Sequence, residues 1–164
     1  MTSVSYGELT KVKPMKKALS VRKKGAGRNS HGRITVRHQG GGVKRRYRDI
    51  DLKQMDKVGV EGRVESIEYD PNRTAFIMKV VYKDGDRRYI LAPAETKVGK
   101  EIVSADKAPL EIGNRMKLSN IPVGYFVHNV EMQPGRGGQI VRSAGSQAQV
   151  LAHEAGYTNL KLPS

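Results

Sequence analysis

The sequence predicts an all-β protein in which a basic, extended N-terminal arm precedes two small barrels. From residue 33 onward, short segments alternate polar and apolar residues, and Gly and Pro separate these segments. No stretch of more than ten residues keeps the apolar stripe of an amphipathic helix. Many short strands at this spacing are typical of small barrels rather than of alternating strands and helices.

The arm is defined by its charge. The segment 11–48 holds 14 Lys and Arg residues and no Asp or Glu, so the whole net charge of +14 lies in these 38 residues. Six glycines stand among the cations, and glycine allows a backbone to approach phosphates closely and to turn with positive φ. Because the segment has few bulky apolar residues, we expect it to be extended in solution and to order on a polyanion, most often a nucleic acid.

Two other interpretations of the basic segment are less favoured. A tail that only aids solubility has no need of interleaved glycines. A mitochondrial presequence would be Arg-rich and amphipathic, whereas residues 1–30 hold six Lys against two Arg and contain Gly and Pro residues that break any helix. A secretory signal would need an apolar central region, and residues 1–30 contain none.

Residues 33–118 are expected to form the first barrel. Residues 58–69 suit a long or bulged strand, and Asp70-Pro71-Asn72-Arg73 is a turn signal. The Asp84-Gly85 pair predicts a tight hairpin, and Pro93 ends the returning strand. The expected strands of this barrel are 33–38, 47–52, 58–69, 75–82, 87–92, 101–103 and 115–118.

Residues 119–164 are expected to form a second strand set. The segment Ile121-Pro122-Val123-Gly124 is typical of a stiff connection, which places the domain seam near Ser119. The expected strands here are 125–131, 138–142, 148–152 and 158–162.

No catalytic or metal-binding constellation is predicted. The chain has no cysteine for a thiolate zinc site, and its four histidines have no His-x-x-x-His spacing. Glu65 and Glu68 are three residues apart, which puts them on opposite faces of a strand and argues against a paired-carboxylate site. No apolar run is long enough to span a membrane.

The segment Pro134-Gly135-Arg136-Gly137-Gly138-Gln139 is a second compact basic feature, and Arg142 follows it. One interpretation is a plain glycine-rich turn. The other, which we favour, is contact with phosphate or 2′-hydroxyl groups of RNA, because two arginines stand beside several glycines with little acid nearby.

Several ordered motifs carry a resemblance to a known family. In the arm they are Gly27-Arg28-Asn29, Gly32-Arg33-Ile34-Thr35, Arg37-His38 and Gly40-Gly41-Gly42. In the first barrel they are Glu68-Tyr69-Asp70-Pro71-Asn72-Arg73, Tyr82-Lys83-Asp84-Gly85 and Arg87-Arg88-Tyr89-Ile90-Leu91-Ala92-Pro93. In the second they are Asn120-Ile121-Pro122-Val123-Gly124, His128-Asn129-Val130-Glu131, the glycine-rich segment and Arg142-Ser143-Ala144-Gly145. In order and spacing, from about Ser20 to the end, they resemble the large-subunit ribosomal protein "L-two" family.

The resemblance implies a fold and a set of partners. It implies a five-stranded oligonucleotide-binding (OB) barrel followed by an SH3-like barrel, so we divide the chain into an arm at 1–32, an OB-fold domain at 33–118 and the first part of an SH3-like domain at 119–164. The implied partners are 23S-type ribosomal RNA and neighbouring ribosomal proteins, with roles in subunit assembly, subunit association and the architecture around the peptidyl-transferase region. The motifs are closest to bacterial or organellar members, which implies a cytoplasmic bacterial ribosome or, alternatively, a mitochondrial or plastid one.

The family pattern continues beyond the strand that ends this sequence. We therefore expect the second barrel to be incomplete here, with a separate chain or a longer product supplying the remainder. Strand edges left unpaired would then need a cover of RNA or protein.

The main hypothesis is a non-catalytic RNA-binding protein that needs no cofactor, with structural Mg²⁺ bridging to the RNA left open. Its rivals are a free-standing translation or chromatin-like binding module and an RNA-directed enzyme. The predicted RNA-binding residues are Lys16, Lys17, Arg22, Lys23, Lys24, Arg28, Asn29, Arg33, Arg37, His38, Lys44, Arg45, Arg46, Arg48, Arg73, Arg87, Arg88, Arg136 and Arg142.

Overall fold

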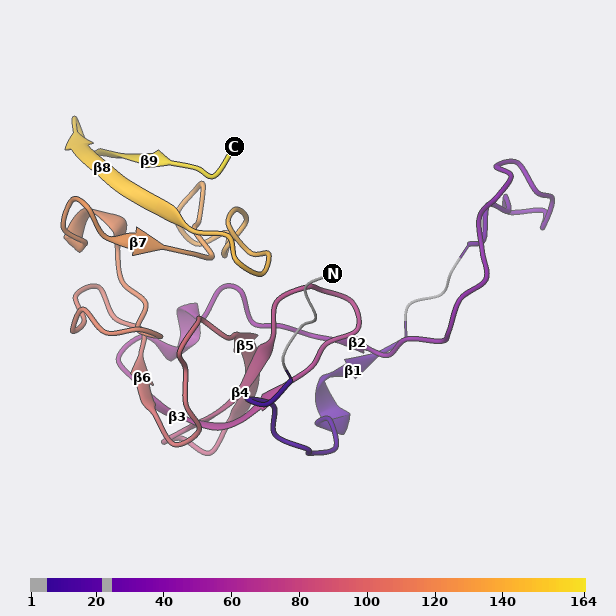
Figure 1. The fold of residues 1–164 in the computed structure, drawn as a ribbon, viewed down its shortest axis with the longest axis horizontal. Coiled ribbons are helices and arrows are strands. Elements are labelled where there is room, and N and C mark those ends of the chain that lie inside the picture. The colour runs from indigo at the N-terminus through magenta and orange to yellow at the C-terminus, as the bar shows by residue number, and fades with distance from the viewer. Residues whose placement is uncertain (1–5, 22–24) are drawn as a thin grey trace.

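The part of the chain that the structure describes forms three antiparallel sheets and a projecting arm (Figure 1). The computed structural model describes residues 6–21 and 25–164. Over these ranges the chain forms no α-helix, and its only helical turns are the 3-10 turns η1 (Lys16–Ala18), η2 (Met55–Lys57) and η3 (Leu118–Asn120). The predicted all-β class is confirmed.

The central sheet carries the main core. Its strands are β3 (Glu61–Glu68), β4 (Ile77–Tyr82), β5 (Arg87–Leu91) and β6 (Glu101–Val103), in the order β5-β4-β3-β6. The bulge expected in the long strand is present in β3, between Val64 and Ser66. One face of the sheet carries a buried core cluster of seven apolar residues: Val64, Ile67, Met78, Val80, Tyr82, Ile90 and Ile102. Ile77, Tyr89 and Leu91 are also buried, so β4 and β5 are covered on both faces.

The edges of this sheet are continued by single bridges. Ile50 pairs in parallel with Tyr89 of β5, and Val58 pairs in parallel with Ser104. The resemblance implies a five-stranded OB barrel. In the described residues four strands are hydrogen-bonded into the sheet, and the segment at Ile50 lies along β5 through a single bridge.

A smaller sheet follows, formed by β7 (Phe126–Val127), β8 (Ala148–Glu154) and β9 (Tyr157–Lys161) in that order. Ala148 and Val150 of β8 and the nearby Val130 are its buried apolar residues. Figure 1 shows this sheet lying beside the central one, joined to it by the loops that follow β6.

Three predicted strands are wrong. Residues 33–38, 115–118 and 138–142 form only single bridges, at Ile34, Arg115 and Ile140. Alternation describes a chain that can present one apolar face, but a strand also needs a partner edge along its length. Residues 33–38 have no sheet beside them, and all six are exposed.

The basic arm leaves the body and returns to it. Strand β1 (Leu19–Ser20) pairs with β2 (Tyr47–Arg48), so the residues between them form a long loop, which we call the projecting arm (21–46); residues 22–24 of it lie outside the described part. Figure 1 shows this loop extending far from the two sheets. The segment before β1 lies on the barrel instead, because Thr10 N–H donates to the Ile67 carbonyl at 2.8 Å and Leu9 packs on the core.

Candidate nucleic-acid interface

A chain of two hydrogen bonds holds Met15, in the segment before the projecting arm, against the barrel. The Met15 N–H donates to the Tyr89 hydroxyl at 2.8 Å, and that hydroxyl donates to Glu68 Oε2 at 2.7 Å. Burial raises the pKa of Tyr89 to about 12, so the hydroxyl keeps the proton that it donates. Ser66 Oγ donates to the other Glu68 oxygen at 2.9 Å, which satisfies a carboxyl group that is only 4% exposed. Glu65 is exposed, as expected for opposite strand faces.

The return of the arm rests on the turn after β3. The Asn72 side-chain amide donates to the Arg46 carbonyl at 2.9 Å and to Asp70 Oδ1 at 3.1 Å, while Arg45 donates to the Pro71 carbonyl at 3.1 Å. Asp70 is fully buried and accepts from Arg73 Nε at 2.6 Å. The turn at residues 70–73 therefore binds the end of the arm, at Arg45 and Arg46, to the barrel.

The far end of the arm is a compact turn, residues 27–38, which we call the tip loop. The Gly27 carbonyl accepts from Thr35 N at 2.9 Å, Val36 N at 3.1 Å and Thr35 Oγ1 at 3.2 Å. The Asn29 side chain accepts from His31 N at 3.0 Å and Arg33 N at 2.9 Å. These bonds give the tip loop a defined shape although it has no buried residue.

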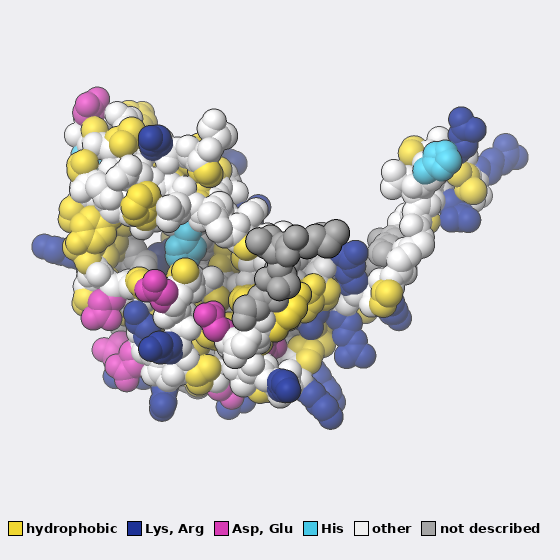
Figure 2. Space-filling view, viewed as in Figure 1, with side chains coloured by type: hydrophobic (Ala, Val, Ile, Leu, Met, Phe, Trp, Pro, Cys, Tyr) yellow, Lys and Arg dark blue, Asp and Glu magenta, His cyan; other side chains and the backbone are white. Residues whose placement is uncertain are grey.

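The cations of the arm face solvent. No carboxylate in the described part of the chain lies within salt-bridge distance of them, and Figure 2 shows Lys and Arg side chains gathered at the tip. The predicted residues that are exposed here or at the arm's base are Lys16, Lys17, Arg28, Asn29, Arg33, Arg37, His38, Lys44, Arg45 and Arg46. Predicted residues Arg22, Lys23 and Lys24 lie outside the described residues.

Two predicted contacts near the base have partners within the chain. Arg73 is paired with Asp70, and its guanidinium carbon stands 5.9 Å from the centroid of the Tyr47 ring. Arg48 is partly buried, donates through Nη1 to the Arg46 carbonyl at 2.8 Å, and has a buried Nε without a partner.

Arg88 lies at the centre of an acidic cluster. Its guanidinium contacts Asp51 Oδ2 at 2.7 Å and Asp86 Oδ2 at 2.8 Å, and it also pairs with Asp56. The hydrogen bond to Asp56 is the main cause that raises the pKa of Arg88, and the bond from Arg88 lowers the pKa of Asp86 to about 2. Because three carboxylates surround it, the Arg88 guanidinium stabilises the packing of the segment before η2 on β5.

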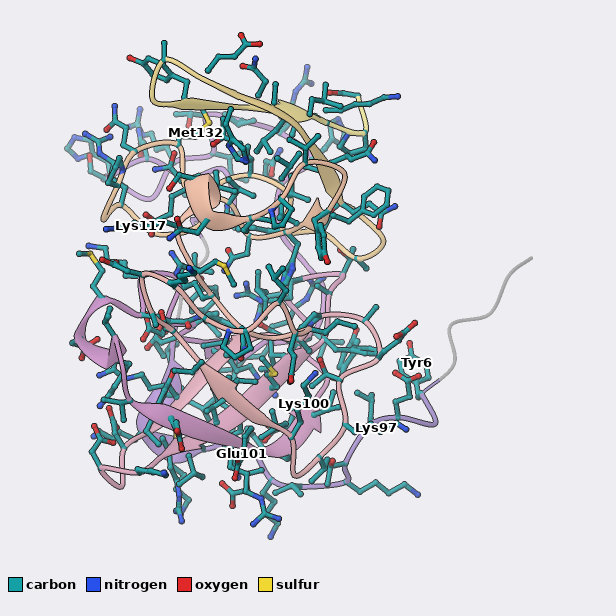
Figure 3. The ribbon with its side chains drawn as sticks, turned by 90° about the vertical axis from the view of Figure 1, so that its left-hand side faces the viewer. Tyr6, Lys97, Lys100, Glu101, Lys117 and Met132 are labelled. Atoms are coloured by element: carbon teal, nitrogen blue, oxygen red, sulfur yellow. The ribbon has the colours of Figure 1, made fainter. Side chains whose placement is uncertain are left out.

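The neighbouring Arg87 is exposed, and its guanidinium pairs only loosely, with Glu65 at 3.8 Å. The barrel surface beyond it carries both signs of charge: Lys83 pairs with Glu61, and Lys97, Lys100 and Glu101 lie near one another in Figure 3. This mixture distinguishes the barrel surface from the uniformly basic arm.

The backbone N–H groups of the glycine-rich segment 134–139 bind a carboxylate of the same chain. The Gly135 and Gly137 N–H groups both donate to the Glu131 carboxylate at 3.0 Å, and Arg115 pairs with the same carboxylate at 2.5 Å. Backbone N–H groups converging on one point are typical of an anion site, and here Glu131 occupies that point.

The two arginines beside this segment are exposed. Arg136 points no group at a carboxylate in the described ranges, whereas Arg142 donates to the Gly138 carbonyl at 3.3 Å. RNA contact by these side chains stays a prediction.

The sequence reasoning missed three residues that shape the interface: Asp70, Asn72 and Glu131. Each lies inside one of the motifs given above. The roles of Asp70 and Asn72 could have been predicted, since Asp and Asn in turns commonly form local hydrogen bonds. Which backbone groups Glu131 would meet depended on the fold.

The histidines and acids show no catalytic arrangement in the part of the chain that the structure describes. His153 is engaged on both ring nitrogens, by Thr158 Oγ1 at 3.0 Å and the Ile121 carbonyl at 2.8 Å. Over the same residues, no group of three His, Asp or Glu side chains is placed to hold a metal ion.

Two family models match the chain, and together they cover most of it. The model for ribosomal proteins L2, RNA binding N-terminal domain, matches residues 15–104, and the model for ribosomal proteins L2, C-terminal domain, matches residues 111–164. The chain belongs to the ribosomal protein L2 family. It is therefore an RNA-binding protein of the large ribosomal subunit, from a family of structural ribosomal proteins rather than a class of enzymes.

The L2 domain models meet between residues 104 and 111, just after β6. The N-terminal match includes the whole projecting arm, so the arm belongs to the RNA-binding domain of the L2 family. None of the described helical turns is long or apolar enough to cross a membrane.

Proposed function

We propose that this chain binds 23S-type ribosomal RNA mainly through the projecting arm, with the two sheet domains as its anchor. The observation that carries the proposal is the cluster of exposed cations along the arm, which face no carboxylate among the described residues. Guanidinium and ammonium groups that have no carboxylate partner are available to phosphates.

We do not include Arg88 among the RNA contacts. Arg73 and Arg48, which have partners within the chain, would contribute less to RNA affinity than the cations of the arm. Arg87, Arg136 and Arg142 remain proposed surface contacts on the sheets, because all three are exposed. No cofactor or catalytic step is part of the proposal, and Mg²⁺ would enter only as a bridge between the bound RNA and the chain.

The wider role follows from the family. We propose that the chain supports assembly and association of subunits and the architecture around the peptidyl-transferase region, beside neighbouring ribosomal proteins. From the resemblance to bacterial and organellar members we propose a cytoplasmic bacterial ribosome, with a mitochondrial or plastid ribosome as the alternative.

A salt titration with deproteinised large-subunit ribosomal RNA tests the proposal. If about eight phosphates are neutralised, log K should fall against log salt with a slope of about −6 to −7. A flat response, or equal affinity for an uncharged polymer, would show that the exposed cations are not the binding groups. Co-sedimentation with large subunits through a high-salt wash separates a resident protein from a transient factor, which should wash off.

A further inference from the structure

The tip loop carries exposed apolar side chains as well as cations. Ile34 is 60% exposed and Val36 is 53% exposed, although each stands next to or near an arginine. Figure 2 shows hydrophobic side chains beside the Lys and Arg side chains at the far end of the arm. Single exposed apolar residues are common on any surface, so their meaning here depends on the shape of the loop.

The backbone of the loop explains why these two side chains are presented. Thr35 faces Gly27, since its N–H and its hydroxyl both donate to the Gly27 carbonyl. Ile34 and Val36, on either side of Thr35, are left exposed. Ile34 is held by its bridge to Arg28, and Val36 by its own N–H bond to Gly27.

The shape of the loop requires glycine at position 27. Its φ is +68°, and a Cβ atom at this position would lie 2.1 Å from the Val36 carbonyl oxygen. Asn29 closes the other side of the turn through two backbone N–H groups. The tip loop is therefore held in this geometry by short-range polar bonds within the chain itself.

We propose that the tip loop docks on RNA as a preformed element, with Ile34 and Val36 packed against ribose and base surfaces while Arg28, Arg33 and Arg37 bind the flanking phosphates. The proposal rests on the proposed RNA-binding function and adds the non-electrostatic contact. A protein partner is less favoured, because the apolar pair is surrounded by cations and no acid occurs between residues 11 and 48. Ribose rings and the faces of unstacked bases, unlike phosphates, offer apolar surface, and single-stranded loops of RNA expose such bases. Asn29, predicted as an RNA contact, becomes a positioning residue in this arrangement.

The binding test uses variants that keep charge and β-branching. Ile34→Thr and Val36→Thr, each in the full chain, should weaken binding to deproteinised large-subunit ribosomal RNA about three- to fivefold, the loss expected for one buried methyl-sized group. The salt slope should stay that of the parent chain. The matched control Arg33→Gln should weaken binding and also make the slope shallower by about one unit.

Hydrogen exchange on the free protein tests the preformed shape. The Arg33, Thr35 and Val36 amides should be protected without RNA, and Asn29→Ala should remove the protection at Arg33. Unchanged RNA affinity in both threonine variants would overturn the apolar contact, and unprotected amides in the free chain would overturn the preformed loop. Failure of the parent chain itself to bind the RNA would instead count against the proposed function.

Discussion

Arg87 and Arg88 are adjacent on β5 but lie in different surroundings. Successive residues of a strand face opposite sides of the sheet, so one guanidinium reaches solvent and the other reaches the cluster of Asp51, Asp56 and Asp86. An arginine-rich motif is therefore not a uniform RNA-binding site. Whether each arginine is available to RNA depends on the carboxylates that the fold places beside it.

This contrast predicts different results for the same substitution. Arg88→Met should lower the free energy of unfolding by about 1–3 kcal/mol, because three acids lose their shared hydrogen-bond donor, and should leave the salt slope of RNA binding unchanged. Arg87→Met should leave stability within about 0.5 kcal/mol of the parent and should weaken RNA binding. Urea denaturation and RNA titration of both variants measure the two effects. The reverse pattern would assign the RNA contact to Arg88.

The acidic cluster also predicts a pH dependence of stability. The pKa of Asp86 is lowered from 3.8 to about 2 in the folded chain because Arg88 donates to its carboxylate. Between these two values the unfolded chain binds more protons than the folded one, so stability rises with pH there. The contribution is complete above about pH 5 and disappears as the pH falls through 2. In urea denaturation at stepwise lower pH, Arg88→Met should lose less stability than the parent over this range, and equal losses would contradict the assignment.

At the scale of elements, the projecting arm shows what strand patterns predict and what they miss. The long bulged strand, the hairpin at Asp84-Gly85 and the terminal pair of strands follow from alternation and turn residues, which act locally. The segment 33–38 alternates as clearly but has no neighbouring edge, so it becomes a turn. The basic segment was predicted as an extended arm; only the β1–β2 pairing shows that it is a loop with both ends on the barrel.

That geometry makes the arm removable. The Cα atoms of Ser20 and Tyr47 are paired across β1 and β2, so Asn-Gly in place of residues 22–45 should close the ribbon with a tight turn. The excision removes eight basic residues and should reduce the salt slope of RNA binding to less than half, while circular dichroism shows the sheets intact.

A matched variant keeps the loop length and replaces the same eight basic residues with Gln. It should lose affinity to a similar extent, which separates charge from length. Full affinity in either variant would mean that the sheet domains do most of the binding. Deleting everything up to residue 48 is a poorer test, because Leu9, Thr10 and Met15 contact the barrel.

At the scale of the whole molecule, the glycine-rich segment joins the two sheet domains. The Gly138 N–H donates to the Leu52 carbonyl at 2.9 Å, and a Cβ atom on Gly137 would lie 3.0 Å from the same oxygen. The Ala144 N–H reaches Thr74 Oγ1 at 3.1 Å, and Arg115 pairs with Glu131 across the connection. These glycines therefore permit close packing of one domain on the other.

Gly138→Ala tests this packing. The added Cβ would lie 1.8 Å from Asn129 Oδ1, so the segment must shift away from its seat. We expect a loss of about 1–3 kcal/mol and, in urea, separate transitions for the two domains in place of a shared one. Gly25→Ala is the matched control, since nothing lies within 4 Å of its added Cβ and its φ is not positive. A single transition with parental stability for Gly138→Ala would mean that the domains do not depend on this contact.

Strand alternation, glycine placement and the position of charge were sufficient to predict the all-β class, most of the strands and a basic arm, because each acts over a few residues. The motifs likewise pointed to the family that the domain models confirm. Tertiary structure alone decided which cations remain free, since an arginine's availability depends on carboxylates brought near it from distant segments, as Asp51 and Asp56 are to Arg88. It also decided that Glu131 fills the glycine-rich turn and that the arm returns to the barrel, because both depend on contacts that no local pattern contains.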